Sequence, residues 1–164
     1  MVSLRESPVD APDAHALLSE YFHSREIGFA HQNVVYTITF PAPALFEPPA
    51  GVFVVVEDDE GRAVGCGGIR LIPDGAHGRR YEVKHLYLRP ETRGRGWGRL
   101  LLDELERRAM DFGARELVLD THHSLEAAGG LYATSGFGEI ERYNDNPNAS
   151  VWLRKVLGPQ RPHQ

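Results

Sequence analysis

The sequence predicts one domain of the α/β (α+β) class, built on a mixed central sheet of about six or seven strands with about four helices. Two stretches predict this class. Residues 82–121 contain a strand, a glycine-rich turn, a helix and a second strand, and a strand–helix–strand connection favours parallel pairing. Residues 51–58 and 63–72 are apolar runs joined by a turn rich in Asp and Gly, which predicts an antiparallel hairpin. The sheet is therefore expected to mix both kinds of pairing.

The first elements of the chain are predicted to be a short strand at residues 2–5 and a helix. Asp10 is a favoured N-cap residue, and apolar residues recur at helical spacing from Ala14 to Phe22. A helix is therefore expected over residues 11–23. A second short helix over residues 24–32 is only weakly marked.

A proline-rich loop is expected before the hairpin. Residues 33–50 are irregular, and four prolines between positions 41 and 49 forbid a regular helix there. Phe40, Leu45 and Phe46 lie in this segment. They either line a substrate entrance or anchor the loop to the core, and the sequence leaves both open.

The C-terminal part predicts a strand, a helix and a hairpin. Residues 116–121 form an apolar strand, and residues 124–137 form a short helix capped by Ser124 and weakened by two glycines. The segments GFGEIERY and SVWLRKVL then pair around a polar loop. The resulting order is β-α-(α)-β-β-β-α-β-α-β-β, with a domain at residues 1–157 and a polar tail at residues 158–164.

Composition restricts the classes of function. The chain has 164 residues, 41% hydrophobic and 25% charged, which suits one globular domain with its own core. A net charge of −5 and a pI near 5.9 argue against nucleic acid as the main partner. The first residues lack the apolar run of a signal peptide, and no run approaches the roughly 20 residues of a membrane span. A cytoplasmic protein without a nucleic-acid or membrane partner is expected, and the single cysteine, Cys66, is expected to be a buried small hydrophobe.

The most informative segment spans residues 82–112. After a turn at residues 73–79, the run EVKHLYLRP predicts a strand, and an amphipathic helix follows from Trp97 to Phe112. Between them lies the turn Arg93-Gly94-Arg95-Gly96-Trp97-Gly98. Glycines let backbone N–H groups approach a ligand closely, and a helix start adds unpaired donors. Since arginines crowd this turn of an acidic chain, it is predicted to hold an anion, most plausibly phosphate; the alternative is a helix start with solvated arginines.

The motif Arg93-x-x-Gly96-x-Gly98 after a strand resembles the R/Q-x-x-G-x-G/A signature of the GCN5-related N-acetyltransferase (GNAT) superfamily. The segment LYATSGF, which contains Tyr132, resembles the family's L-Y-x-x-x-G-F, and the order of elements resembles the GNAT fold from end to end. This resemblance implies an N-acetyltransferase that uses acetyl-CoA as co-substrate.

The resemblance also implies where the coenzyme binds. The backbone N–H of Leu86 would hold the acetyl carbonyl, and that of Leu88 would hold the pantetheine arm. Main-chain amides from Gly94 to Arg99 would surround the pyrophosphate. The expected coenzyme-binding residues are Leu86, Tyr87, Leu88, Arg93, Gly94, Arg95, Gly96, Trp97, Gly98 and Arg99.

Acetyl transfer to an amine needs a base for the amine proton and an acid for the departing thiolate. Glu82 lies eleven residues before Arg93, where the histone-acetyltransferase branch of the family has its general-base glutamate. Its alternative role is an ion pair with Arg79, Arg80 or Lys84. Tyr132 matches the tyrosine that commonly protonates the coenzyme sulfur in this family, and its alternative role is a core residue with a satisfied hydroxyl.

One position departs from the family pattern. Many relatives carry an asparagine seven residues before the tyrosine, where this chain has Leu125. His122, His123 or Ser124 substitutes for it, or the contact is absent. Adjacent histidines without surrounding acidic or cysteine ligands do not make a metal site, so no metal is expected.

The expected activity is direct acetyl transfer to a primary amine of a small molecule. Glu82, Asp145 and Glu47, expected near the mouth of the site, would favour a cationic amine. A non-catalytic acyl-CoA sensor and a protein or peptide N-acetyltransferase remain alternatives, whereas an enzyme acting on charged transfer RNA should carry a broad basic face that this chain lacks. A homodimer is also left open, because the strand of Trp152 forms either a dimer edge or simply a sheet edge.

Overall fold

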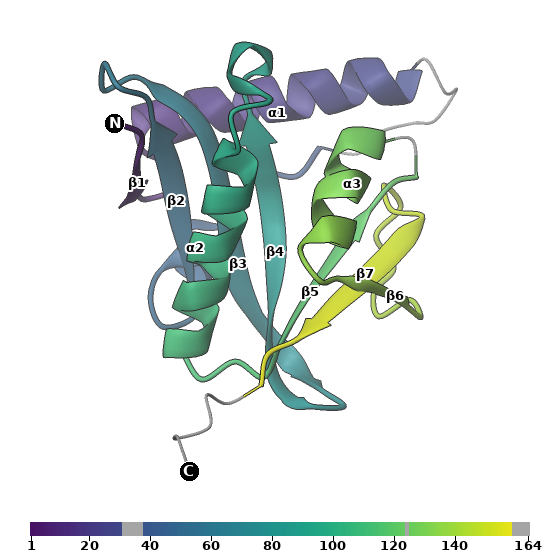
Figure 1. Ribbon diagram of the computed structural model, residues 1–164. Helices are drawn as coiled ribbons and strands as arrows, with labels where there is room; N and C mark the ends of the chain where they lie inside the picture. The colour runs from purple at the N-terminus through teal and green to yellow at the C-terminus, as the bar shows by residue number, and fades with distance from the viewer. Residues whose placement is uncertain (31–37, 124, 159–164) are drawn as a thin grey trace.

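Seven strands form one mixed sheet in the computed structural model, which describes residues 1–30, 38–123 and 125–158 (Figure 1). The strand order is β1-β2-β3-β4-β5-β7-β6, and β4 and β5 are the parallel pair among the described strands. The predicted mixed sheet is therefore confirmed. The strands are β1 (Ser3–Glu6), β2 (Gly51–Glu57), β3 (Ala63–Gly75), β4 (Gly78–Leu88), β5 (Glu116–Thr121), β6 (Gly138–Ile140) and β7 (Val151–Val156).

Three α-helices cover this sheet in the described part of the chain. They are α1 (Pro12–Ala30), α2 (Trp97–Asp111) and α3 (Glu126–Thr134), with short 3-10 helices η1 (Pro43–Phe46) and η2 (Pro90–Thr92). The separate second helix predicted over residues 24–32 is wrong, because α1 runs on without a break. Phe22 and Phe29 are both buried on it, so one apolar face continues through the predicted boundary. The predicted cap Ser124 and the end of the C-terminal tail lie outside the described residues.

The sheet carries a hydrophobic core on each face. Successive residues of a strand point to opposite faces, so Val54 packs in the core of α2 whereas Phe53 and Val55 pack in the core of α1. Tyr132 of α3 belongs to the α2 core. Figure 1 shows α2 and α3 in front of the sheet and α1 crossing behind it.

The apolar face predicted for the central helix is the buried face of α2. Leu105→Ala is expected to lower the free energy of unfolding by about 2–5 kcal/mol, because Leu105 is fully buried and its removal leaves a cavity. Leu100→Ala on the same helix is the matched control, since Leu100 is 45% exposed and should matter by less than about 0.5 kcal/mol. Denaturant titration measures both, and equal losses would contradict this division of the helix into faces.

The hairpin of β3 and β4 is longer than predicted. Pairing continues to Gly75 and resumes at Gly78, through residues expected to form a turn. Two contacts hold this tip: Arg80 Nε donates to the carbonyl of Pro73 at 2.7 Å, and His77 Nδ1 lies 2.8 Å from the buried carboxylate of Glu116. Pairing of the strands brings the two residues of each contact together, so neither contact could be predicted from the sequence alone.

The C-terminal strand is not a sheet edge. β7 lies between β5 and β6, and the outer strand β6 is the short segment Gly138–Ile140. The prediction that the strand of Trp152 forms an edge is therefore wrong, because β5 pairs with β7 along its whole length. No described helix has the length and apolar character that crossing a membrane requires.

β4 and β5 separate halfway along their length. Their parallel pairing joins residues 80–82 to residues 116–118 and goes no further. Beyond it, His85 and Leu86 of β4 lie opposite the single residue Gly67 of β3, which is a β-bulge. Figure 1 shows β4 and β5 diverging toward the end of the sheet that α1 crosses. The main-chain groups on the β5 side of β4 consequently have no strand partner there within the described sheet.

Candidate active site

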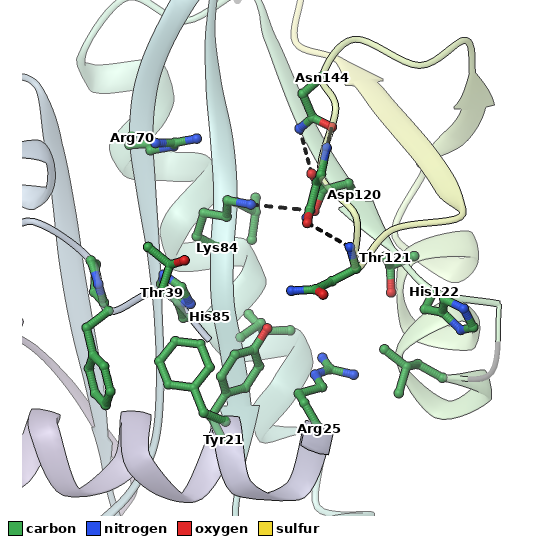
Figure 2. A pocket seen from close by; sticks show the side chains of 18 of the residues that line it. Tyr21, Arg25, Thr39, Arg70, Lys84, His85, Asp120, Thr121, His122 and Asn144 are labelled. Carbon is green, nitrogen blue, oxygen red and sulfur yellow. Dashed lines mark hydrogen bonds and ion pairs between the residues drawn. The ribbon is translucent and has the colours of Figure 1, made fainter. Parts of the chain in front are cut away.

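A cavity of about 510 Å³ opens where β4 and β5 separate (Figure 2). This volume is typical of small-molecule sites. The wall takes side chains from α1, residues 39–46, β3, β4, β5, α3 and the loop before β7. Figure 2 shows Tyr21 and Arg25 rising from α1, with Lys84 and Asp120 across the space from them.

The large apolar residues of the proline-rich loop reach this cavity. Phe40, Leu45 and Phe46 all line it. Phe46 is also buried and packs edge-on against Phe53, with ring centroids 6.2 Å apart. Phe46 therefore anchors the loop to the core, as one of the two predicted roles requires, while all three residues also lie in the cavity wall.

Glu82 lies beneath the cavity and is 1% exposed. Its Oε1 accepts from Arg70 Nε at 2.9 Å and forms an ion pair with Arg70 Nη2 at 2.8 Å. Its Oε2 accepts from the Tyr143 hydroxyl at 2.6 Å and from Asn144 Nδ2 at 3.2 Å. Burial and the nearby carboxylate raise the pKa of Tyr143, so its hydroxyl stays protonated and donates. Both carboxylate oxygens of Glu82 are thus already engaged by protein donors.

Lys84 connects Glu82 with the cavity wall. Its Nζ lies 3.8 Å from Glu82 Oε1 and 3.5 Å from Asp120 Oδ1. Asp120 also accepts from Asn144 Nδ2 at 2.6 Å and from Asn146 Nδ2 at 3.0 Å. Of the ion-pair partners that the sequence offered for Glu82, Lys84 is the one at contact distance.

The main partner of Glu82 is a residue that the sequence did not suggest. Arg70 lies directly opposite Glu82 in the register of β3 and β4, where cross-strand side chains meet. Only the register of the hairpin makes this pair visible, and the lengths of the two strands were underestimated from the sequence.

Tyr132 brings a phenol to the cavity from α3. The residue is buried, its side chain lines the cavity, and its ring lies edge-on to Phe137 at 5.8 Å. Burial raises the pKa of the Tyr132 hydroxyl, against a smaller lowering by Arg25. No described residue makes a hydrogen bond to this hydroxyl. It is therefore a protonated donor that is free to serve a bound molecule.

His85 occupies the β-bulge with a φ of 59°, in the left-handed region that non-glycine residues rarely adopt. Burial lowers the pKa of His85 to about 3, with smaller contributions from Lys84, Arg70 and Arg25. Its Nδ1 is buried without a hydrogen-bond partner among the described residues. The imidazole is therefore neutral at ordinary pH and forms part of the cavity wall.

The lowered pKa of His85 predicts a specific acid sensitivity. The unfolded chain takes up a proton on His85 below pH 6.5 while the folded chain resists it until about pH 3, so stability falls as the pH drops through this window. The loss attributable to this residue reaches up to about 1.4 kcal/mol per pH unit. Denaturant titration between pH 7 and pH 5 should show a steeper loss in the native protein than in His85→Asn, in which the side chain tolerates positive φ but does not titrate. Parallel pH curves would contradict the lowered pKa.

The arginine–glycine turn adopts the conformation that its glycines predict. Gly94 and Gly96 have φ values of 82° and 80°, and Gly96 immediately precedes α2. In the described structure, no acceptor is bonded to the backbone N–H groups of residues 94–96, and the first N–H groups of α2 have no helical partner. The turn therefore presents a run of unpaired amide donors at the positive end of a helix dipole.

The arginine side chains brace this turn. Arg93 Nη2 donates to the carbonyl of Leu88 at 3.2 Å, and Arg99 Nη2 donates to Thr134 Oγ1 of α3 at 2.9 Å. The guanidinium of Arg95 lies 5.2 Å from the centre of the Trp97 ring. Since two of the three guanidinium groups already serve the protein, the backbone amides are the more available donors.

The predicted coenzyme-binding residues do not form one cluster of side chains. Leu86 lines the cavity, whereas residues 93–99 lie at the start of α2 and outside the cavity wall. Tyr87 is buried in the α1 core and donates to Glu20 Oε1 at 3.3 Å, so its side chain faces away from α2. The structure thus brings Tyr132 and Leu86 together at the gap between β4 and β5, with the turn at the neighbouring helix start.

The structure does not bear out an acidic mouth. Asp145 is almost fully exposed and pairs with Arg142 at 3.8 Å, and neither Asp145 nor Glu47 lines the cavity. Glu82 is covered, as described above. The charged side chains that do line it are Arg25, Arg70, Lys84 and Asp120.

Several cavity residues could not be identified from the sequence. Asp120 ends a strand, and Asn144, Asn146 and Asn148 alternate in a polar loop that lies next to it through the pairing of β5 with β7. The alternating asparagines of this loop were the available signal.

The residues proposed as substitutes for that asparagine lie at the end of β5. His122 and Leu125 line the cavity, and the ring of His122 stacks on His123 at 4.3 Å. Burial lowers the pKa of His122, which keeps its ring neutral. Among the described residues, no group of three or more His, Cys, Asp or Glu side chains could hold a metal ion.

Comparison with known proteins gives a consistent picture. Residues 13–137 match the model of the acetyltransferase (GNAT) family. An uncharacterised N-acetyltransferase of Schizosaccharomyces pombe is 35% identical over 150 residues, which cover 92% of this chain and 90% of the relative. The IAA acetyltransferase of Azospirillum brasilense is 34% identical over 100 residues, 59% of this chain and 63% of the relative. A solved phosphinothricin acetyltransferase of the GNAT superfamily from Sinorhizobium meliloti, in complex with AcCoA, matches with a TM-score of 0.71 and 23% identity, over 96% of this chain and 89% of its own.

The fold and these relatives together define an N-acetyltransferase. The chain belongs to the acetyltransferase (GNAT) family, whose model covers most of its length.

Proposed function

We propose that the protein transfers an acetyl group from acetyl-CoA directly to the primary amine of a small molecule. The observation that carries this proposal is the Tyr132 hydroxyl, which is protonated, lines the cavity between β4 and β5 and has no hydrogen-bond partner in the described structure. A proton donor left free at such a gap suits the departure of a thiolate.

In this proposal the coenzyme enters through the gap between β4 and β5. Its diphosphate binds the unpaired amides of residues 94–99, and the N–H groups of Leu86 and Leu88 hold the acetyl carbonyl and the pantetheine arm. The separation of the strands beyond residue 82 supports this path, because it leaves main-chain groups of β4 without a strand partner. The solved relative from Sinorhizobium meliloti, which binds AcCoA, supports acetyl-CoA as the donor.

The reaction then forms one bond and breaks one. The amine nitrogen attacks the thioester carbonyl, the C–N bond forms and the C–S bond breaks, and Tyr132 gives a proton to the departing sulfur. The amine proton passes to Glu82, the predicted base. Since Glu82 lies beneath the cavity, Lys84 relays this proton: its Nζ, which lies 3.8 Å from Glu82 Oε1, passes one proton to Glu82 as it takes one from the amine.

A small acceptor is favoured by the size of the cavity. Its volume of about 510 Å³ suits a small molecule, and its wall combines α1 with the loops 39–46 and 144–148. A pure acyl-CoA sensor is less favoured, since binding alone uses neither the Tyr132 phenol nor the network around Glu82.

Two measurements test the proposal together. Calorimetry is expected to detect acetyl-CoA binding, and free thiol should be released when acetyl-CoA is mixed with members of a panel of small primary amines. Binding without any thiol release would favour the sensor, and release only with peptide amines would favour a protein-modifying enzyme. Absence of acetyl-CoA binding would overturn the proposal itself.

A further inference from the structure

The charges of the cavity wall do not cancel. Arg70 and Lys84 are matched by the carboxylates of Glu82 and Asp120, with which they form ion pairs at 2.8 and 3.5 Å. The two histidines that line the wall are neutral, because burial lowers the pKa of each. Arg25 is the remaining charge, so the wall carries about one positive charge in excess.

Arg25 has no carboxylate partner among the described residues. Its guanidinium lies 4.9 Å from the centre of the Tyr21 ring, one helical turn earlier on α1. This contact orients the side chain, and its N–H donors have no hydrogen-bond partner among the described residues. Figure 2 shows Arg25 pointing from α1 into the cavity, toward the side of Asp120. A half-buried guanidinium held in this way is suited to bind a planar anion such as a carboxylate.

The coenzyme phosphates do not explain this charge. The amide turn belongs to α2, which covers the opposite face of the sheet from α1. None of residues 93–99 lines the cavity. Arg25 is therefore on the side from which an acceptor, not the diphosphate, approaches the gap between the strands.

The same cavity has a continuous aromatic side. The ring centroids of Phe22 and Phe40 are 4.9 Å apart, and the ring centroid of His85 is 5.6 Å from those of both Tyr21 and Phe22. With His85 uncharged, this side offers apolar ring faces and no charge. A bound molecule that also contacts Arg25 must therefore combine an apolar part with an anionic part.

We propose that the acceptor is an amino acid with an apolar side chain, whose carboxylate binds Arg25 and whose side chain packs against the aromatic side of the cavity. The proposal rests on the acetyl transfer proposed above, since it assigns the amine of that reaction. It replaces the cationic amine suggested by the sequence: the positive wall repels a purely cationic molecule and attracts one whose carboxylate offsets its ammonium group. The side chain of Arg25 acts as a specificity determinant through this contact.

The test uses matched acceptors that differ only at the carboxylate. Thiol release from acetyl-CoA is measured with phenylalanine, its methyl ester and phenethylamine, and with leucine and isoamylamine. The native protein should prefer each amino acid to its uncharged counterpart by about 10- to 100-fold in kcat/KM, the usual effect of one hydrogen-bonded charge pair. Arg25→Ala should reduce this ratio to near one, mainly through KM, and Arg25→Lys should retain part of it. Arg62→Ala removes an exposed arginine at the β2–β3 turn and should leave the ratio unchanged.

The outcomes separate the two proposals. If the ester and the decarboxylated amines are used as well as the amino acids, the acceptor class is wrong while acetyl transfer to small amines stands. If the preference for amino acids survives in Arg25→Ala, Arg25 is not the anion site and the inference is overturned. If acetyl-CoA binds but no member of any pair releases thiol, the acceptor class and the proposed transfer fail together.

Discussion

Tyr132→Phe is expected to lower kcat by about 100-fold or more, with little change in the KM for acetyl-CoA. The substitution removes the hydroxyl and keeps the ring that packs on Phe137, so the coenzyme path along β4 is preserved. What is lost is the proton that the departing sulfur needs. Because burial raises the pKa of Tyr132, the native enzyme should also keep its rate on the alkaline side until well above the ordinary phenol pKa of about 10.

The matched control is Tyr81→Phe. This substitution also removes the hydroxyl of a buried tyrosine, but Tyr81 lies on β4 and outside the cavity. Tyr81 donates to the carbonyl of Pro49 at 2.7 Å, so its loss should reduce stability by about 1–3 kcal/mol and leave kcat nearly unchanged. Steady-state thiol release and denaturant titration separate the two effects. Equal kcat values for the two variants would rule out Tyr132 as the proton donor.

Glu82→Gln is expected to lower kcat by about 100-fold, because an amide cannot accept the amine proton. The same substitution replaces the ion pair with Arg70 by a neutral hydrogen bond and removes the negative charge beside Lys84. If Glu82 only positioned these cations, the KM for the acceptor would rise while kcat stayed close to native. The split between kcat and KM therefore decides whether Glu82 is a base or a positioning residue.

Glu116→Gln supplies the control for Glu82. Glu116 lies on the adjacent strand, is also 1% exposed and also receives hydrogen bonds, from the backbone and the ring of His77. It lies outside the cavity, so its substitution should cost stability without affecting the reaction. A comparable fall in kcat for both variants would mean that the activity loss comes from destabilisation.

The parts of the fold that depend on local patterns were predictable. Helical spacing predicted the buried face of α2, and Gly94 and Gly96 predicted a turn, in which both have positive φ. Alternating and apolar runs predicted the strands. Local spacing failed at boundaries, where α1 absorbed a second helix and β3 and β4 continued through a predicted turn. Burial of Phe29 extends α1 beyond its predicted end, and cross-strand pairing extends β3 and β4 into the predicted turn. In both places these long-range contacts outweighed the local preference of the sequence for an end of the element.

The sequence by itself determined the family, the amide turn at residues 93–99 and the tyrosine of the LYATSGF segment, because each is a short motif whose chemistry lies within a few neighbouring residues. Only the tertiary structure decided what surrounds them. Register placed Arg70 on Glu82 and covered the predicted base, and the separation of β4 from β5 made the cavity. The crossing of α1 behind the sheet brought Arg25 to that cavity, far along the chain from the other charges. The sign of the cavity's charge depends on such long-range pairings, which a one-dimensional pattern of acidic residues does not contain.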